Sequence, residues 1–268
     1  MNIFTFWEPK DKMPAYIKLS MQTWEKFLPE YDINVIDYSN LNEYLGENYF
    51  DENLFKDFSL PMQADAVRCA LLHKFGGLWL DADTIITSPR SNDFIGVKSD
   101  LVMIGQHLAF IKANKNSKII RFWNKKIKDK LLFYKKQKYN KDSFLLMIDR
   151  ILHRKWYKNI DPYSWDYLGN SILNKYLHKA SHKEFFSIDK YKANALPELL
   201  NCDSNNTNLI ENYQKFYFYN DYSTDVLNNT KGIILLHNSW TPEEYLNMNE
   251  QEFLQQNNTI SNILKKIL

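Results

Sequence analysis

The stretch Lys74–Pro89, KFGGLWLDADTIITSP, places two aspartates inside an apolar run. Leu78-Trp79-Leu80 comes before Asp81-Ala82-Asp83, and β-branched residues resume at Thr84. A buried carboxylate is costly unless it is paired or bound to a metal. Because side chains two residues apart on a strand point to the same face, we expect both carboxylates to converge on one ligand.

Oxygen donors select hard cations such as Mg²⁺ or Mn²⁺, which keep part of their coordination shell for phosphate oxygens. In open α/β sheets the ligand crevice lies at the carboxyl ends of the strands. The sequence therefore predicts a metal–diphosphate site at Asp81 and Asp83, with Gly76-Gly77 allowing close backbone approach beside it. The alternative is that the two aspartates cap a turn after an edge strand.

The segments around this stretch predict an α/β fold. A strand at Asn2–Trp7, a helix after Pro14 and a strand at Ile33–Tyr38 form a β-α-β opening, which favours a mainly parallel sheet flanked by helices. Pro61 is expected to begin a helix that ends at Gly76. Further strands are expected at 101–105, 108–113 and 232–237, with the motif stretch reading as one more.

The chain of 268 residues fits a single domain. Residues 1–116 and 231–248 are expected to form the α/β core, and residues 117–230 a helical insertion. A net charge of +2 is too small to argue for nucleic acid, so no nucleic-acid partner is expected. The oligomeric state is left open.

The two cysteines, Cys69 and Cys202, suggest neither a disulfide framework nor a zinc site. Cys69 lies in an apolar helical pattern and is expected in the core. The first residues lack the pattern of a signal peptide, and no apolar run approaches the roughly 18 residues of a membrane span. These features predict a cytoplasmic protein.

The segment QADAVRCALLHKFGGLWLDADT resembles the sugar-nucleotide-binding segment of glycosyltransferases with a D-x-D motif. That family includes mannosyltransferases, α-galactosyltransferases of glycolipid synthesis, bacterial capsular polysaccharide synthesis proteins and, more distantly, the clostridial glucosylating toxins. Weaker similarity extends to FTFWEP, YLGNSIL and HNSW. The resemblance implies a GT-A-like, Rossmann-type nucleotide-sugar-binding fold. Its pattern matches at Ala64, Asp65, Arg68, Leu72, Gly76, Gly77, Trp79, Asp81 and Asp83.

The resemblance implies roles for four of these residues. Asp83 would be the principal ligand of a divalent cation, and Asp81 would contact the ribose and the metal. Asp65 and Arg68, three residues apart on one helix face, would hold the hydroxyls of the donor sugar. By spacing alone, Asp65 and Arg68 also fit a surface ion pair, which contributes little stability.

Two further segments supply candidates by resemblance. Trp7 is the candidate to stack on the nucleotide base, or else it is a core residue. His237 is a candidate metal or diphosphate ligand, or else it is structural. Asn238, Ser239 and Trp240 would donate hydrogen bonds to the diphosphate.

The implied function is that of a metal-dependent retaining glycosyltransferase. It would move a sugar from a nucleotide-diphosphate sugar, with a UDP-sugar favoured, to a glycan acceptor in capsular or other surface polysaccharide synthesis. One alternative is a haloacid-dehalogenase-like phosphatase with Asp81 as nucleophile, although that motif usually opens its domain. Another alternative is an inactive nucleotide-sugar-binding protein.

The middle of the chain is rich in lysine. Together with an apolar helical stripe, this composition is typical either of a solvated helix face or of contact with an anionic membrane. The second interpretation predicts a peripheral protein on the inner face of the membrane, close to a lipid-linked acceptor. The C-terminal ILKKIL repeats the pattern. The lysines are Lys125, Lys126, Lys128, Lys130, Lys135, Lys136 and Lys138.

Overall fold

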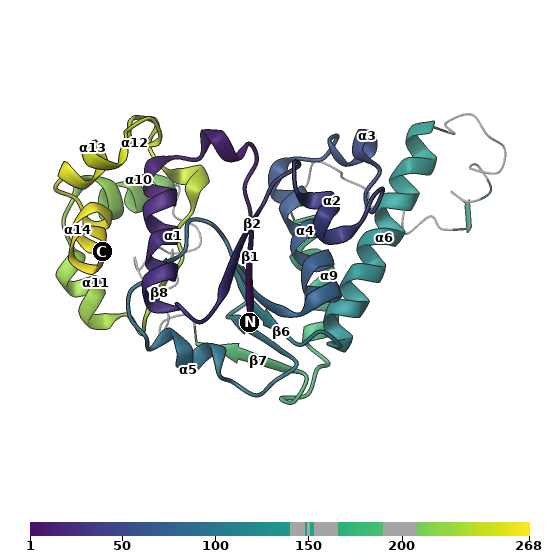
Figure 1. Ribbon diagram of the computed structural model, residues 1–268. Coiled ribbons are helices and arrows are strands. Elements are labelled where there is room, and N and C mark those ends of the chain that lie inside the picture. Colours follow the sequence, from purple (N-terminus) through teal and green to yellow (C-terminus); the bar gives the residue numbers. More distant parts are fainter. Residues whose placement is uncertain (140–147, 149–150, 153–165, 190–207) are drawn as a thin grey trace.

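The computed structural model describes residues 1–139, 148, 151–152, 166–189 and 208–268. In this part of the chain a six-stranded sheet lies between two groups of helices (Figure 1). Its strand order is β2-β1-β3-β6-β5-β7. The strands are β1 (Asn2–Phe6), β2 (Asp32–Ile36), β3 (Gly77–Leu80), β5 (Leu101–Ile104), β6 (His107–Ala113) and β7 (Phe185–Ile188).

Three of the five strand pairings are parallel, namely β1 with β2, β1 with β3, and β5 with β7. The other two, β3 with β6 and β5 with β6, are antiparallel. The expected α/β class with a mainly parallel sheet is therefore confirmed. The carboxyl ends of β1, β2 and β3 all lie at one edge of the sheet, because these strands are parallel.

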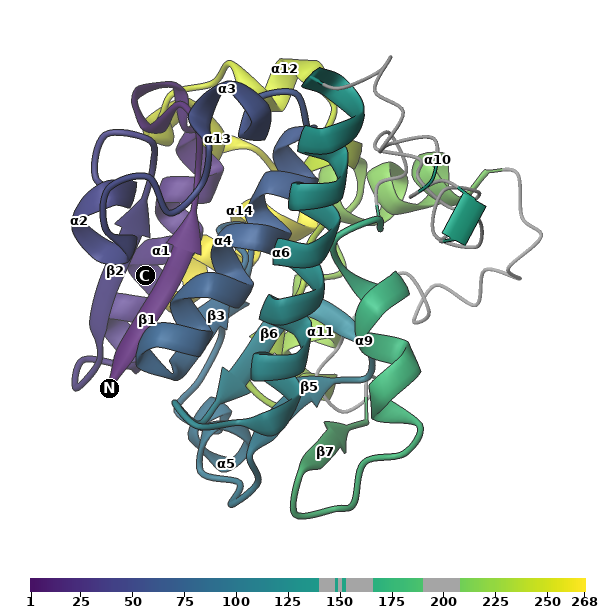
Figure 2. The same ribbon diagram turned by 90° about the vertical axis from the view of Figure 1, so that its right-hand side faces the viewer.

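One face of the sheet is covered by α4 (Leu60–Phe75), with α6 (Lys118–Tyr139) and α9 (Asn170–Leu177) packed outside it (Figure 2). Phe4 and Trp79 point into this core, and Trp123 of α6 fills it from the other side. α4 is buried on nearly all sides. The shorter helices α2 (Leu41–Leu45) and α3 (Glu52–Phe55) lie on the same side of the sheet in Figure 1.

The other face is covered by α1 (Ala15–Phe27) and the C-terminal helices. Ile3, Leu78 and Leu80 point to this side, so the side chains of β1 and β3 alternate between the two cores as strand geometry requires. The remaining helices are α5 (Ser91–Ile95), α10 (Leu209–Gln214), the π-helix Lys215–Tyr219, α11 (Ser223–Asn229), α12 (Glu243–Leu246), α13 (Glu250–Gln255) and α14 (Thr259–Ile267).

The motif strand ends earlier than its apolar sequence predicts. β3 stops at Leu80, and Thr84 N donates to Asp81 O at 2.9 Å across a turn. The chain then forms β4 (Ile85–Ile86), which pairs antiparallel with β8 (Ile233–Ile234) in a separate two-stranded sheet. The predictions of one continuous motif strand and of a late strand over residues 232–237 were therefore wrong, because β8 contains only Ile233 and Ile234. The two aspartates lie in the turn between two sheets.

Gly76 and Gly77 serve the fold and not the ligand site. Both have positive φ, and a Cβ on Gly77 would lie 2.6 Å from the carbonyl oxygen of Asn2. A Cβ on Gly76 would lie 2.6 Å from Lys115 N. These contacts are at the start of β3, about 13 Å of strand before Asp81. The expectation that the glycines lie beside the carboxylates was therefore wrong.

The region 117–230 contains more than helices, because β7 extends the main sheet from within it. Its residues 140–147, 149–150, 153–165 and 190–207, and with them Cys202, lie outside the described residues. Cys69 is fully buried in the core, as expected. Among the helices that the structure describes, none combines the length and apolar character of a membrane span.

Trp24 joins α1 to the end of the motif turn. Its ring is fully buried, and Nε1 donates to the carbonyl oxygen of Thr84 at 2.7 Å. We expect Trp24→Phe to lower the free energy of unfolding by about 1–3 kcal/mol, because a buried carbonyl loses its donor. Urea denaturation measures this change. Tyr31→Phe, which removes a 3.5 Å hydrogen bond to Asn92, is the control and should change stability by less than about 0.5 kcal/mol. Equal midpoints for the two variants would contradict the prediction.

Candidate functional site

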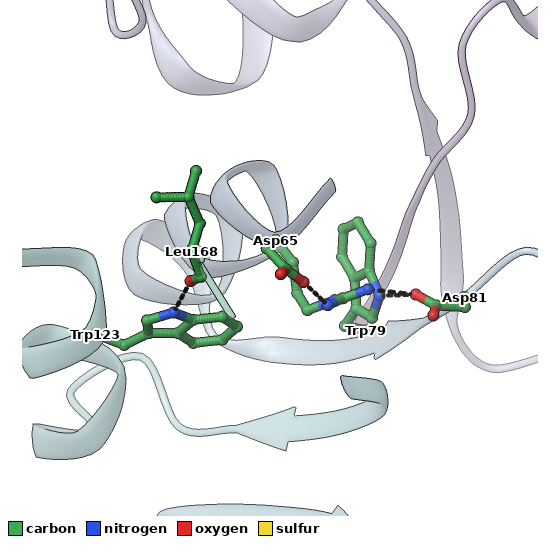
Figure 3. Close-up of polar contacts among 6 residues, drawn as sticks. Asp65, Trp79, Asp81, Trp123 and Leu168 are labelled. Atoms are coloured by element: carbon green, nitrogen blue, oxygen red, sulfur yellow. Dashed lines mark hydrogen bonds and ion pairs between the residues drawn. The ribbon is translucent and has the colours of Figure 1, made fainter. Parts of the chain in front are cut away.

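A buried arginine joins two of the predicted site carboxylates. Arg68 is 4% exposed; its Nη1 donates to Asp65 Oδ1 at 2.5 Å and its Nη2 to Asp81 Oδ1 at 2.6 Å. Trp79 Nε1 donates to the same Asp81 oxygen at 2.7 Å, and the guanidinium carbon lies 4.8 Å from the centre of the Trp79 ring. Figure 3 shows Asp65, Trp79 and Asp81 around this contact. The surface ion pair considered for Asp65 and Arg68 is therefore wrong.

The spacing of the motif explains why these side chains meet. α4 runs down to Gly76, and β3 then runs back along it to Asp81. From Arg68 to Gly76 the helix rises about 12 Å, and from Gly77 to Asp81 the strand rises about 13 Å. The helix and the strand thus extend about equally far from the two glycines, so Arg68 lies beside the end of β3.

Asp83 is buried beside this arrangement. It is 7% exposed, and its Oδ2 accepts a hydrogen bond from Asn238 N at 2.7 Å. Burial, and then the charge of Asp81, raise the pKa of Asp83 to about 7. Burial likewise raises the pKa of Asp65 to about 7, although Arg68 opposes this effect. Both carboxylates are therefore held in surroundings that disfavour their negative charge.

The C-terminal segment reaches Asp83 through Asn238. Asn238–Trp240 forms a short 3₁₀ helix, and Tyr16 of α1 donates to Asn238 Oδ1 at 2.6 Å. The structure therefore brings the predicted Asn238 to the D-x-D turn. Tyr16 has no sequence signal that would have identified it, because a tyrosine on an apolar helix face is usually a core residue.

His237 and Trp240, which lie close to Asn238 in the sequence, pack in an aromatic cluster. The rings of His237 and Trp240 pack together with centres 4.3 Å apart, and Tyr213 OH accepts a hydrogen bond from His237 N at 2.9 Å. Ser239 is exposed. The structure thus places His237 in an aromatic cluster next to the Asp83 contact.

Trp7 follows β1 at the same edge of the sheet. Its ring is half-buried against the core that also includes Trp240, so it has both a packed and an open side. A cavity of about 550 Å³ adjoins the segment after Trp7, at the carboxyl ends of β1 and β2. It is lined by Glu8, Pro9, Lys10, Asp11, Asp37, Tyr38 and Ser39.

The carboxylates fit a hard divalent cation. Asp81 interacts electrostatically with Asp65 and with Asp83, and the charge of Arg68 acts on both of these groups. Two aspartates offer oxygen ligands and leave coordination positions open for phosphate oxygens. Within the described ranges, no group of three His, Cys, Asp or Glu side chains is arranged to hold a metal, so His237 does not form such a group with Asp81 and Asp83.

The raised pKa of Asp83 predicts how stability depends on pH. The folded protein binds this proton with a pKa of about 7 and the unfolded chain with a pKa near 3.8, so stability falls as pH rises from about 4 to about 7. We expect Asp83→Asn to raise the melting temperature at pH 8 in the presence of a chelator, and to have less effect at pH 4. The gain is a few kcal/mol at most, since a tenfold change in proton binding corresponds to about 1.4 kcal/mol.

Thermal denaturation at the two pH values measures this difference. Asp225→Asn, at an exposed position of α11, is the control and should leave both melting temperatures unchanged. A lower melting temperature of Asp83→Asn at pH 8 would show that the buried carboxylate stabilises the fold.

Comparison with known proteins gives short matches to curated sequences. The lactosylceramide 4-alpha-galactosyltransferase of Rattus norvegicus is 39% identical over 61 residues, which are 22% of this chain and 17% of that protein. The human protein of the same name is 40% identical over 58 residues, which are 21% of this chain and 16% of that protein. The matched part thus spans less than a fifth of these relatives.

Two solved structures are similar over most of this chain. A glycosyltransferase involved in the glycosylation of the major capsid of PBCV-1 has 12% identity and a TM-score of 0.44, over 92% of this chain and 98% of that chain. The glycosyltransferase GlyE of Streptococcus pneumoniae TIGR4 has 13% identity and a TM-score of 0.44, over 99% of this chain and 62% of that chain.

A family model matches nearly the whole sequence, over residues 1–259. Its description is that of a capsular polysaccharide synthesis protein. The match includes the helix with Asp65 and Arg68, the turn with Asp81 and Asp83, and the segment around Asn238. The chain therefore belongs to the family of capsular polysaccharide synthesis proteins.

Proposed function

We propose that the protein is a metal-dependent, retaining glycosyltransferase that uses a nucleotide-diphosphate sugar. One observation carries this proposal. Arg68 forms ion pairs with two carboxylates, Asp65 and Asp81, at the carboxyl edge of the sheet, and the C-terminal segment holds a third carboxylate, Asp83, in the same turn as Asp81. Such an excess of negative charge favours a divalent cation, and the open positions of that cation favour a diphosphate.

The donor is proposed to lie along this edge of the sheet. The cavity after β1 and β2 would take the nucleotide, with the open side of Trp7 against the base. Asp83 and Asp81 would hold Mn²⁺ or Mg²⁺, and Asp65 and Arg68 would hold the sugar. The curated relatives are named galactosyltransferases, so UDP-galactose is the first donor to test.

The proposed reaction breaks the bond between the anomeric carbon and a diphosphate oxygen. A bound cation supplies charge neutralisation for the leaving diphosphate. Asn238, Ser239 and Trp240 are proposed to donate hydrogen bonds to the same group, and such fixed donors stabilise charge that develops in the transition state. We propose that an acceptor hydroxyl forms its bond to the anomeric carbon on the face that the diphosphate leaves, and that a phosphate oxygen of the leaving group takes the hydroxyl proton. The carboxylates of the site would be engaged by Arg68 and the cation, so none of them serves as a nucleophile.

The phosphatase alternative fits this geometry less well. A nucleophilic Asp81 needs a free carboxylate oxygen of high electron density. Asp81 Oδ1 accepts hydrogen bonds from both Arg68 and Trp79, which withdraw electron density from the carboxylate. The side chain of Asp81 is 35% exposed, which suits a contact to a ribose or a metal.

The acceptor is proposed to be a glycan on an anionic membrane surface. Of the seven lysines named from the sequence, five contact other residues of the protein. Lys126 pairs with Asp129, Lys135 with Asp51 and Lys138 with Asp57, while Lys128 lies over the ring of Tyr49 and Lys130 over the ring of Tyr167. Lys125 and Lys136 are exposed and extend the charged face. Ile263, Leu264 and Ile267 of ILKKIL are buried in α14 and belong to the core, whereas Leu268 after the helix is exposed.

Donor hydrolysis tests the function. We expect the protein to release UDP from UDP-galactose or another UDP- or GDP-sugar when Mn²⁺ is present, and excess chelator to abolish the reaction. Asp83→Asn should reduce turnover at least 100-fold, because the principal candidate ligand of the cation is lost. A coupled assay of nucleotide release measures the rate, with Asp225→Asn as the control. Full activity in chelator, or in Asp83→Asn, would contradict the metal role.

Vesicle sedimentation tests the membrane contact. We expect the protein to bind vesicles with phosphatidylglycerol at low salt and to release them as salt rises, because each lysine near an anionic surface contributes about 1 kcal/mol. The double variant Lys125→Glu, Lys136→Glu should bind at least tenfold more weakly. Lys98→Glu with Lys115→Glu makes the same charge change at two exposed positions away from α6 and is the control. Equal binding of all three proteins would exclude α6 as the contact.

A further inference from the structure

A loop distant in sequence lies directly against Asp65. Residues 166–169 lead into α9, and a Cβ on Gly169 would lie 2.3 Å from Asp65 Oδ2 and 2.8 Å from Leu108 Cδ1. No side chain fits in such a space without displacing one of these neighbours. The φ of Gly169 is −100°, so a left-handed backbone is not what requires glycine here. Figure 3 shows Leu168 in the same region as Asp65.

The loop is fixed at three successive carbonyl groups. Ser171 Oγ donates to Asp166 O at 2.7 Å, Lys130 Nζ donates to Tyr167 O, and Trp123 Nε1 donates to Leu168 O at 2.6 Å. Gly169 N also donates to Asp166 O at 3.0 Å. Because Trp123 is fully buried in α6, the loop cannot move away from Asp65 without breaking buried hydrogen bonds.

Two residues of this region, Arg68 and Asn170, each carry a buried polar atom that has no partner within the described part of the protein. Among the described residues, Arg68 Nε and Asn170 Oδ1 are buried and have no hydrogen-bond partner. Arg68 is the partner of Asp65, and Asn170 follows Gly169. Buried polar atoms nearly always have a partner, which is protein, water or a bound molecule. The charge of Asp166 also raises the pKa of Asp65, so the loop adds a carboxylate to the neighbourhood.

We propose that the loop 166–170 is the second wall of the donor-sugar subsite and that Gly169 is the residue that positions Asp65. The inference rests on the proposed function. One oxygen of Asp65 is held by Arg68 and the other is packed against Gly169, so the carboxylate has one orientation toward the hydroxyl groups of a sugar. A site built to bind a hydroxyl group rejects a sugar that lacks it, so the orientation of Asp65 selects the donor sugar.

Gly169→Ala tests this inference. The probe is the UDP-sugar that the wild type hydrolyses fastest. We expect the affinity of the variant for this UDP-sugar to fall at least tenfold, whereas its affinity for UDP with Mn²⁺ should stay within twofold of the wild type. Isothermal titration measures both affinities. Gly96→Ala is the matched control, since Gly96 ends α5 with helical φ, and a Cβ there would meet only Asn92 O at 3.1 Å. Equal losses for UDP and the UDP-sugar would show that Gly169 acts on the fold as a whole and would overturn the inference.

A second experiment requires neither a donor sugar nor enzymatic activity. If Gly169 leaves space for the Asp65 carboxylate, Gly169→Ala should lower the melting temperature strongly in the wild type and only slightly in an Asp65→Ala background, where that carboxylate is gone. Should Gly169→Ala alone fail to fold, the double variant Asp65→Ala, Gly169→Ala should still fold. Equal decreases in both backgrounds would overturn the inference. A wild type that hydrolyses no nucleotide sugar would contradict the proposed function, yet this experiment would still report on the contact itself.

Discussion

The buried guanidinium of Arg68 holds the site together. It forms ion pairs with Asp65 on its own helix and with Asp81 at the end of β3, and it lies over the ring of Trp79. A buried arginine is tolerated only when its charge is matched, and here Asp65 and Asp81 both lie within ion-pair distance, so either carboxylate can match it. The ion pairs of Arg68 therefore fix both the position of α4 against the sheet and the positions of Asp65 and Asp81.

This arrangement leaves the site with more negative than positive charge. Arg68 matches one carboxylate, while Asp65 and Asp83 both have a pKa raised to about 7 by burial. The fold thus holds these groups where their charged forms are disfavoured, which is common at functional sites and rare elsewhere. In the proposed function, a cation would relieve the cost for Asp83 and Asp81, and the hydroxyl groups of a donor sugar would relieve it for Asp65. Binding and stability are therefore linked through the same carboxylates.

The turn at Asp81–Asp83 is also where distant parts of the chain meet. Strand β3 of the main sheet ends there at Leu80, and strand β4 of the two-stranded sheet begins at Ile85. Through β8 the C-terminal segment returns to Asp83, where Asn238 N donates its hydrogen bond. From the other side, the loop at Gly169 closes on Asp65. Three segments separated by more than 60 residues thus surround one group of carboxylates.

The sequence by itself determined the α/β class and the β-α-β opening, and the resemblance assigned Asp65, Arg68 and Asp81 to one site. That Arg68 meets Asp81 follows from the nearly equal rise of α4 and β3 on the two sides of Gly76, which the structure shows. Only the tertiary structure decided that the strand stops at Leu80, because an apolar run is compatible with one strand or with two strands in different sheets. It also decided the contacts of Tyr16 with Asn238 and of Gly169 with Asp65. Such contacts join residues more than 100 positions apart, and no local periodicity encodes which distant residue fills the space beside a carboxylate.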